Sequence, residues 1–275
     1  MECLICKSKS EFFFSKKYEE EPFATFMKDI GSVDYYKCTN CGFTVSKTHG
    51  QLTTAQWEKL NFDFHDDQEK NIQLRQINQP PYLEQAMMVN ILAANYIIDT
   101  SDMLDFAGGH GTLSNVLGKY FNINLPVYDP FMQNSERQIY VAKKNLKKYK
   151  VVINSAVFEH IITMNDLDQI NNCVADDGCM ILHTVVCENI PHDANWFYYA
   201  PPVHCAFHTN KSMEILMHRW NYTSSVYCVK SKCWVLFKKG AKVTDIEAKV
   251  DAINGEFQEK YLIYKEGFVD YWKGF

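Results

Sequence analysis

The nine residues from Met103 to Gly111 read MLDFAGGHG, and this stretch decides the fold of the chain. Its first half is a short apolar run typical of a buried strand, and its second half is a glycine-rich loop. A helical pattern follows over residues 112–120. Strand, glycine loop and helix in this order predict a nucleotide-binding unit, because glycines let the backbone approach a ligand at the start of the helix.

A second predicted strand, over residues 124–128, supports this interpretation. It ends in Asp129, which lies 24 residues after Asp105. An acidic residue at this distance can accept hydrogen bonds from the ribose hydroxyls of a cofactor. A dinucleotide-dependent oxidoreductase begins in the same way, but its G-x-G-x-x-G motif requires a glycine where Ser114 stands. The sequence therefore favours another nucleotide cofactor.

Strands and helices continue to alternate along the rest of the chain. The predicted elements are a strand from residue 151, a helix over 166–174, a turn over 176–178, strand 179–186, helix 212–220, and strands 224–229 and 233–237. Strands that alternate with helices favour parallel pairing in one sheet with helices on both of its faces. We therefore expect an α/β fold.

Three segments resemble the class I S-adenosylmethionine-dependent methyltransferases. Residues 105–111, DFAGGHG, are similar to the D-x-G-x-G-x-G motif, with Ala107 at the first glycine. Residues 151–161, VVINSAVFEHI, are similar to the fourth strand and its following vlEHi segment. Residues 204–212, HCAFHTNKS, are similar to the H..fFt.ksl segment that opens the next helix. The resemblance covers about residues 82–239 and implies a Rossmann-like methyltransferase sheet.

The resemblance also implies a cofactor site for S-adenosylmethionine. Asp105 and Gly109 would shape the methionine end of this site, and Asp129 would bind the ribose hydroxyls. The complete set of expected cofactor-binding residues is Asp105, Ala107, Gly109, Gly111, Asp129, Asn154 and Ala156.

Two histidines are candidates for a catalytic base, because imidazole can accept a proton near neutral pH. His204 is the first candidate, since it matches the histidine at which the related sugar methyltransferases carry a base. His160 is the second candidate, and it could equally anchor a loop through a backbone hydrogen bond.

Four N-terminal cysteines predict a metal-binding module. Cys3 and Cys6 form one C-x-x-C pair, Cys38 and Cys41 form another, and 31 residues separate the pairs. Two such pairs can supply the four thiolates of a structural zinc ion. The alternative is four reduced cysteines in a small hairpin, but a segment of about 50 residues builds little core without a metal. The other six cysteines are expected in the core.

The chain is expected to divide into a zinc-ribbon-like module over residues 1–50, a polar connector over 51–80, a methyltransferase domain over 81–242 and a helical, aromatic-rich tail over 243–275. The tail would pack on its own domain or on a second copy in a homodimer. The first residues lack the features of a signal peptide, and the chain has no apolar run of membrane-spanning length. We therefore expect a cytoplasmic protein with no membrane partner.

The expected acceptor follows from resemblance and charge. The four-cysteine N-terminus makes the chain similar to sugar C-methyltransferases with an N-terminal zinc-binding domain, which implies a small polar acceptor such as a nucleotide-linked sugar or another surface-glycan precursor. The aromatic loop over residues 192–202 would stack on this acceptor or cover it as a lid.

Two other functions are weighed against this one. The first is an RNA methyltransferase with a zinc ribbon, but a formal net charge of -5 gives no attraction to a phosphate backbone. The second is a noncatalytic zinc-ribbon adaptor, which the intact Asp105 loop and Asp129 disfavour.

Overall fold

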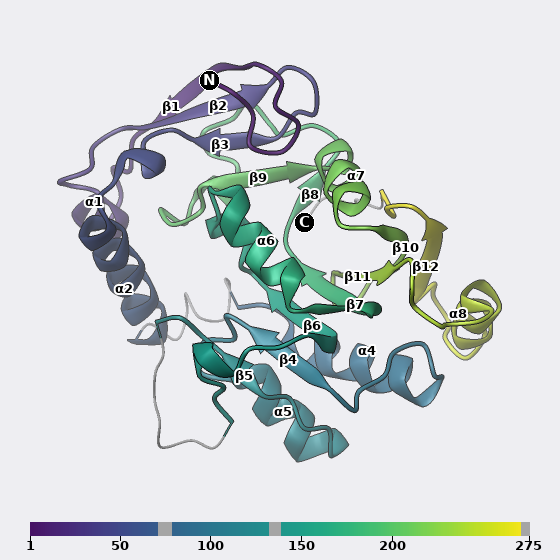
Figure 1. The fold of residues 1–275 in the computed structure, drawn as a ribbon. Helices are drawn as coiled ribbons and strands as arrows, with labels where there is room; N and C mark the ends of the chain where they lie inside the picture. The colour runs from purple at the N-terminus through teal and green to yellow at the C-terminus, as the bar shows by residue number, and fades with distance from the viewer. Residues whose placement is uncertain (71–78, 132–138, 271–275) are drawn as a thin grey trace.

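The computed structural model describes residues 1–70, 79–131 and 139–270 of the chain. The helices are α1 (Phe23–Phe26), α2 (Thr54–Lys70), α4 (Tyr82–Ala94), α5 (Thr112–Phe121), α6 (Met164–Asn172), α7 (Asn210–Arg219) and α8 (Ile246–Gly255), with short 3-10 helices η1 (His49–Gln51), η2 (Lys143–Asn145), η3 (Phe158–His160) and η4 (Phe197–Tyr199). The strands form two sheets, shown in Figure 1.

The larger sheet has seven strands in the order β12-β10-β11-β7-β6-β4-β5. These strands are β4 (Met103–Phe106), β5 (Val127–Tyr128), β6 (Tyr149–Ser155), β7 (Val174–His183), β10 (Tyr222–Cys228), β11 (Cys233–Lys238) and β12 (Leu262–Glu266). Strands β5, β4, β6 and β7 pair in parallel, whereas β11, β10 and β12 pair antiparallel to their neighbours. The predicted α/β fold with a Rossmann-like sheet is confirmed.

Helices cover both faces of this sheet, which explains why its strands read as apolar runs. Leu104 and Val152 face a core that includes residues of α6 and α7. Their neighbours Met103 and Val151 face the opposite core, which includes residues of α4, α5 and α8. In Figure 1, α4 and α5 lie below the sheet, and α6 and α7 lie above it.

Strand β7 differs from the expected turn and strand. The predicted turn over residues 176–178 lies inside β7, where the pairing with β6 shifts register. Gly178 is needed there, because a side-chain carbon would lie 2.5 Å from the carbonyl oxygen of Lys150. The predicted strand over 179–186 also ends earlier than expected, because Val186 belongs to β8 (Val186–Cys187) in the other sheet.

The smaller sheet joins the N-terminal residues to the segment that follows β7. Its order is β1-β2-β3-β9-β8, with β1 (Ser10–Lys16), β2 (Val33–Cys38), β3 (Thr44–Ser46) and β9 (Ala206–Thr209). Strand β3 pairs antiparallel with β9, so the purple N-terminal strands of Figure 1 lie beside green β9. Side chains add to this contact, since the Lys211 ammonium donates to the Asn40 carbonyl at 2.9 Å. The N-terminal residues therefore pack directly on the 186–209 segment.

Residues 51–80, expected to form a polar connector, contain the 17-residue helix α2. Trp57, Leu60 and Phe64 recur at helical spacing, and the last two are buried. They pack in a third hydrophobic core with Phe14 and Tyr35 of the N-terminal strands. A single apolar stripe among polar residues thus specifies a helix that lies against the N-terminal module.

The C-terminal segment packs on the larger sheet. After α8, strand β12 pairs with β10, and the Phe268 ring stacks on Trp234 with centroids 5.4 Å apart. The last aromatic residues of the expected tail, from residue 271 onward, lie outside the described residues. None of the described helices is both long and apolar enough to cross a membrane.

Candidate functional site

The residues expected to bind a cofactor lie around the carboxyl ends of three neighbouring strands. Strand β4 pairs with β5 on one side and with β6 on the other. The chain passes from β4 to β5 and then crosses back to β6, so the edge beyond β4 is where α/β sheets bind ligands. The glycine loop follows β4, Asp129 follows β5, and Ala156 follows β6.

Asp129 is held against the glycine loop. One of its carboxylate oxygens accepts the backbone N–H of Gly109 at 2.9 Å, and the other accepts that of Phe131 at 2.8 Å. The Tyr140 hydroxyl donates to the Gly109 carbonyl at 2.8 Å. The two loops that follow β4 and β5 are therefore fixed to each other, with a half-buried carboxylate between them.

The backbone explains the residue types of the glycine loop. Ala107 has a φ of 58°, a left-handed conformation that costs an L-residue roughly 1–2 kcal/mol. This is the position at which the methyltransferase motif has its first glycine. At Gly108 a side-chain carbon would lie 2.4 Å from a carboxylate oxygen of Asp105, so this position requires glycine.

Two buried polar side chains at this edge have atoms without a partner among the described residues. Asp105 is 2% exposed, and none of these residues forms a hydrogen bond with one of its carboxylate oxygens. Burial, together with the nearby Asp129 charge, raises the pKa of Asp105 to about 7. Asn154 is fully buried, and its amide nitrogen and oxygen form no hydrogen bond within the part of the chain that the structure describes. Buried polar groups are normally paired, so these atoms could be satisfied by a bound ligand.

A second cluster, which we call the histidine centre, consists of Glu159, His160 and His204. One carboxylate oxygen and one ring nitrogen of each histidine lie within 4.8 Å of one another. Helix η3 carries the first two residues directly after β6, and His204 precedes β9. The backbone N–H of Cys205 donates to the Glu159 carbonyl at 2.8 Å, which joins the two segments. The structure thus brings together both histidines that the sequence had singled out.

The orientation of His204 is fixed by the backbone. Its Nδ1 lies 2.9 Å from the carbonyl oxygen of Tyr198, which can only accept a hydrogen bond. Nδ1 must therefore carry the proton, and Nε2 keeps its lone pair. Burial lowers the pKa of His204 to about 4, so the imidazole is neutral at physiological pH.

His160 is also neutral. Burial, followed by the neighbouring His204 and His65, holds the pKa of His160 well below its ordinary value. Its Nδ1 forms no hydrogen bond with any residue in the described ranges. The two rings meet nearly edge to face, with centroids 5.2 Å apart. The exposed His65 on α2 also lies near His160, with ring centroids 6.1 Å apart.

Two hydroxyl groups hold the Glu159 carboxylate. The Tyr198 hydroxyl donates to one oxygen at 2.7 Å, and the Thr184 hydroxyl donates to the other at 3.0 Å. Burial nevertheless raises the pKa of Glu159 to about 7. Tyr198 and Thr184 belong to no motif in the sequence, whereas Glu159 was visible only as part of the vlEHi resemblance.

The aromatic loop over residues 192–202 contributes mainly to packing. Tyr198 and Tyr199 are buried, and the Tyr199 ring contacts Phe14, Tyr35 and Phe207 in the core beneath the N-terminal sheet. Phe197 is 46% exposed. Of the two roles considered for this loop, stacking on an acceptor therefore has little support from Tyr198 and Tyr199, whose rings are enclosed.

The four N-terminal cysteines converge on one point. The sulfurs of Cys3 and Cys41 are 3.7 Å apart, those of Cys6 and Cys38 are 3.4 Å apart, and all four lie within 4.8 Å of one another. Four thiolates around zinc are separated by about 3.8 Å, as bonds of about 2.3 Å in a tetrahedron require. The Cys38 sulfur also accepts the backbone N–H groups of Asn40 and Cys41, both at 3.4 Å.

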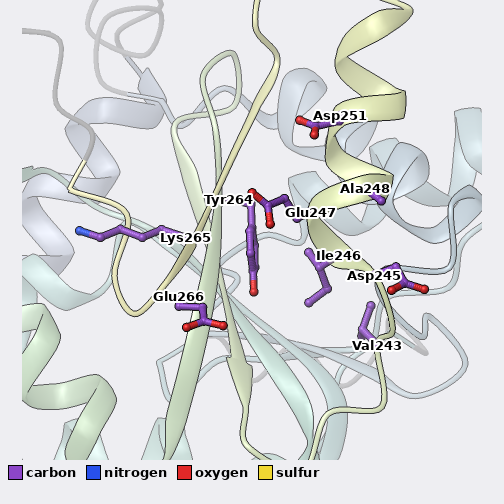
Figure 2. A pocket seen from close by; sticks show the side chains of 9 residues that line it. All are labelled: Val243, Asp245, Ile246, Glu247, Ala248, Asp251, Tyr264, Lys265 and Glu266. Atoms are coloured by element: carbon purple, nitrogen blue, oxygen red, sulfur yellow. The ribbon is translucent and has the colours of Figure 1, made fainter.

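A pocket of about 700 Å³ lies elsewhere, between α8 and β12 (Figure 2). Its lining includes Asp245, Glu247, Asp251 and Glu266, and the Tyr264 ring lies opposite Ile246. It contains none of the residues that the sequence assigned to a cofactor, a metal or a base.

Comparisons with known proteins identify the family of the part of the chain that runs from α4 to α7. A family profile described as a methyltransferase domain matches residues 81–224. No curated protein matches the sequence of the chain.

Several solved structures match parts of the chain at low sequence identity. The plantazolicin methyltransferase BpumL, solved in complex with SAH, is 10% identical, with a TM-score of 0.45, and the match covers 66% of this chain and 95% of BpumL. An O-methyltransferase family protein from Burkholderia thailandensis is 11% identical, with a TM-score of 0.42 over 72% of this chain and 63% of that protein. A SAM-dependent methyltransferase from Archaeoglobus fulgidus is 14% identical, with a TM-score of 0.37 over 52% of this chain and 72% of that protein.

Proposed function

Because the chain belongs to the methyltransferase-domain family, its activity is S-adenosylmethionine-dependent methyl transfer, and we propose that the cofactor binds beyond β4, β5 and β6, with a small polar acceptor beside the histidine centre. The main support for this proposal is that expected cofactor-binding residues at the end of β6 are followed at once by two residues of the histidine centre. Asn154 lies near the end of this strand and Ala156 directly after it, at the cofactor edge, and Glu159 and His160 follow within four residues of Ala156. Cofactor and acceptor chemistry would thus meet at one strand end.

The residues present fit this cofactor. Its sulfonium supplies an electrophilic methyl group when bound. Asp129 offers carboxylate oxygens to the ribose hydroxyls, because each oxygen that accepts a backbone N–H keeps further acceptor capacity. The glycine loop removes side chains from the path of the ligand, and the unpartnered atoms of Asp105 and Asn154 are available to its polar groups.

The chain's contribution to the reaction is positioning and proton transfer. Holding the acceptor in line with the methyl group supplies a large part of the rate in such a displacement. His204 directs the lone pair of Nε2 away from the Tyr198 carbonyl, so Nε2 is the atom that would take a proton from an acceptor hydroxyl or an enolisable carbon. His160 lies at the side of this ring and would orient the acceptor.

The acceptor that we propose is a nucleotide-linked sugar or another precursor of a surface glycan. The resemblance to sugar methyltransferases with four N-terminal cysteines supports this class. The alternative, an RNA methyltransferase, would require a positive surface. Residues 1–50 carry seven acidic and seven basic side chains, which provides no such surface in the N-terminal module.

We also propose a structural zinc ion bound by Cys3, Cys6, Cys38 and Cys41. The spacing of the four sulfurs supports this donor set. The ion would fix the hairpins at the end of β2 and so support β3, which pairs with β9. The chemistry of this site is purely structural, since four protein thiolates leave no open position.

The acceptor class can be tested by incubating the purified protein with S-adenosylmethionine and matched panels of nucleotide-linked sugars and RNA. Mass spectrometry would follow formation of S-adenosylhomocysteine and of the methylated product. We expect a product that is 14 mass units heavier within the sugar panel, about one methylene. Methylation of RNA alone would favour the alternative, and methylation of neither panel would reject the proposed acceptor class.

A further inference from the structure

The histidine centre brings together a carboxyl group and two imidazole rings, and no ion pair among the described residues includes the carboxyl group. Glu159 is 2% exposed, and none of the ion pairs recorded among the described residues includes it. The two histidine rings beside it meet nearly edge to face, and each offers a ring nitrogen within 4.8 Å of a Glu159 carboxylate oxygen. Burying a carboxyl group among described residues that form no ion pair with it is costly, and a metal ion between the three side chains would supply a positive charge there.

We propose that Glu159, His160 and His204 bind one divalent transition-metal ion, at a site distinct from the four cysteines. Two imidazoles and one carboxylate form a nitrogen and oxygen donor set that suits iron, manganese or zinc. Three protein ligands leave at least one coordination position open, as catalytic sites do and structural sites do not. The open position would take an oxygen atom of the acceptor.

The hydrogen bonds around the three ligands resemble those of metal sites. A metal-bound histidine usually donates its other ring nitrogen to a backbone carbonyl, as His204 does to Tyr198 at 2.9 Å. Metal-bound carboxylates are themselves hydrogen bonded, as Glu159 is by the hydroxyls of Tyr198 and Thr184. These contacts aim Nε2 of His204 and orient the carboxylate before an ion arrives.

The distances require only a small adjustment. The three donor atoms lie within 4.8 Å of one another, whereas donors around a tetrahedral ion with bonds of about 2.1 Å are roughly 3.4 Å apart. Rotation about the side-chain torsions of His160 can close such a gap. The Nδ1 atom of His160 has no partner in the described residues, so no hydrogen bond at that atom would have to break.

The role of the ion rests on the proposed function. With Nε2 bound to a metal, His204 would be a ligand and not a free base. An acceptor hydroxyl bound to the ion would instead lose its proton to bulk water at a lower pH than a free hydroxyl. Its oxygen would then form a bond to the methyl carbon while the bond from that carbon to the cofactor's sulfur breaks, and S-adenosylhomocysteine would leave with the sulfur's electron pair.

The test uses Mn²⁺ as the probe, because manganese prefers nitrogen and oxygen ligands over thiolates and leaves a zinc-filled cysteine site undisturbed. Full-length protein that carries one zinc ion per chain, which fills the four thiolates and leaves the histidine centre open, is titrated with Mn²⁺, and free Mn²⁺ is counted by electron paramagnetic resonance. We expect one site per chain, weakened roughly tenfold or more in Glu159→Gln and in His204→Ala. The variant His218→Ala removes an exposed histidine of α7 and should bind Mn²⁺ as the unchanged protein does.

Three outcomes would overturn the proposal: no Mn²⁺ binding, equal binding in all variants, or weakening by His218→Ala. Glu159→Gln keeps an oxygen that can accept from Tyr198, and circular dichroism would verify that each variant is folded. Calorimetry with S-adenosylhomocysteine on the same proteins separates this proposal from the proposed function. Intact nucleoside binding without Mn²⁺ binding would reject only the metal site.

Discussion

Replacing Asp129 by alanine is the most informative single change at the cofactor edge. Its carboxylate accepts the N–H groups of Gly109 and Phe131 at 2.9 and 2.8 Å, which holds it at the glycine loop. If the ribose hydroxyls bind to the same carboxylate, the change removes charge-assisted hydrogen bonds worth about 1.5–3 kcal/mol each. Solvation of the empty site offsets part of this loss. We therefore expect the affinity for S-adenosylmethionine to fall at least tenfold, about 1.4 kcal/mol.

Calorimetry measures this affinity directly, and two variants control for indirect effects. Asp129→Asn keeps one oxygen acceptor, so its affinity should lie between those of the alanine variant and the unchanged protein. Asp176→Ala removes an exposed carboxylate whose recorded partner is Lys148, and should leave the affinity unchanged. If a folded Asp129→Ala protein binds the cofactor as tightly as the unchanged protein, Asp129 does not bind the ribose.

The remaining predictions concern four other positions. Asp105→Asn should stabilise the protein at neutral pH. Burial raises the pKa of Asp105 from 3.8 to about 7, so between these pH values the folded state holds a proton that the unfolded state releases. The stability of the unchanged protein therefore falls as pH rises through this range. Urea unfolding should therefore show that the variant has a larger free energy of unfolding than the unchanged protein. This difference should be absent below about pH 4 and reach at most about 4 kcal/mol above pH 7. A difference that does not depend on pH would contradict the prediction. Ala107→Gly relieves a left-handed φ of 58° and should stabilise by up to about 1 kcal/mol, net of the extra chain entropy of glycine; a lower denaturation midpoint would count against it. Elemental analysis should find zinc in the unchanged protein and one zinc ion fewer per chain in Cys38→Ser, because the four cysteines bind it. The variant should also unfold at a lower temperature, because β3 supports β9. Equal zinc content in both proteins would show that the four cysteines do not bind zinc. His204→Ala should lower turnover by a factor of roughly 10² to 10⁴ with cofactor affinity nearly unchanged, and full turnover in steady-state kinetics would show that His204 has no part in the reaction.

The sequence predicts the larger sheet well because its strands are buried on both faces. Strands such as β4 and β6 therefore read as apolar runs, and the glycine loop marks where the first of them ends. The antiparallel strands β10 and β11 also lie close to their expected positions. Local residue pattern and tertiary burial agree in this part of the chain.

The smaller sheet could not be predicted in the same way. Strands β3 and β8 are three and two residues long. They are too short to show the alternation of apolar and polar residues that predicts a strand. The pairing of β3 with β9 joins residues about 160 positions apart, and nothing local specifies it. The sequence predicts a connector where helix α2 lies, because the apolar stripe of this helix is narrow. The helix is stabilised by packing against the N-terminal module.

The candidate site was only partly visible in the sequence. Motif resemblance pointed to His160 and His204 separately, 44 positions apart. Their meeting depends on the bond from the Cys205 amide to the Glu159 carbonyl, which is a tertiary contact. Thr184 and Tyr198, which hold the Glu159 carboxylate, come from segments without a motif. A hydrogen-bond network assembled from distant segments leaves no pattern in one sequence.

The most direct test of the central claim is a crystal structure of the protein with S-adenosylhomocysteine. We predict that the ribose hydroxyls will bind the Asp129 carboxylate beside Gly109, and that the sulfur will face His204 across a space that the acceptor can occupy. Binding of the nucleoside away from the glycine loop, for example in the pocket between α8 and β12, would contradict the cofactor site. A sulfur directed away from the histidine centre would contradict its part in methyl transfer.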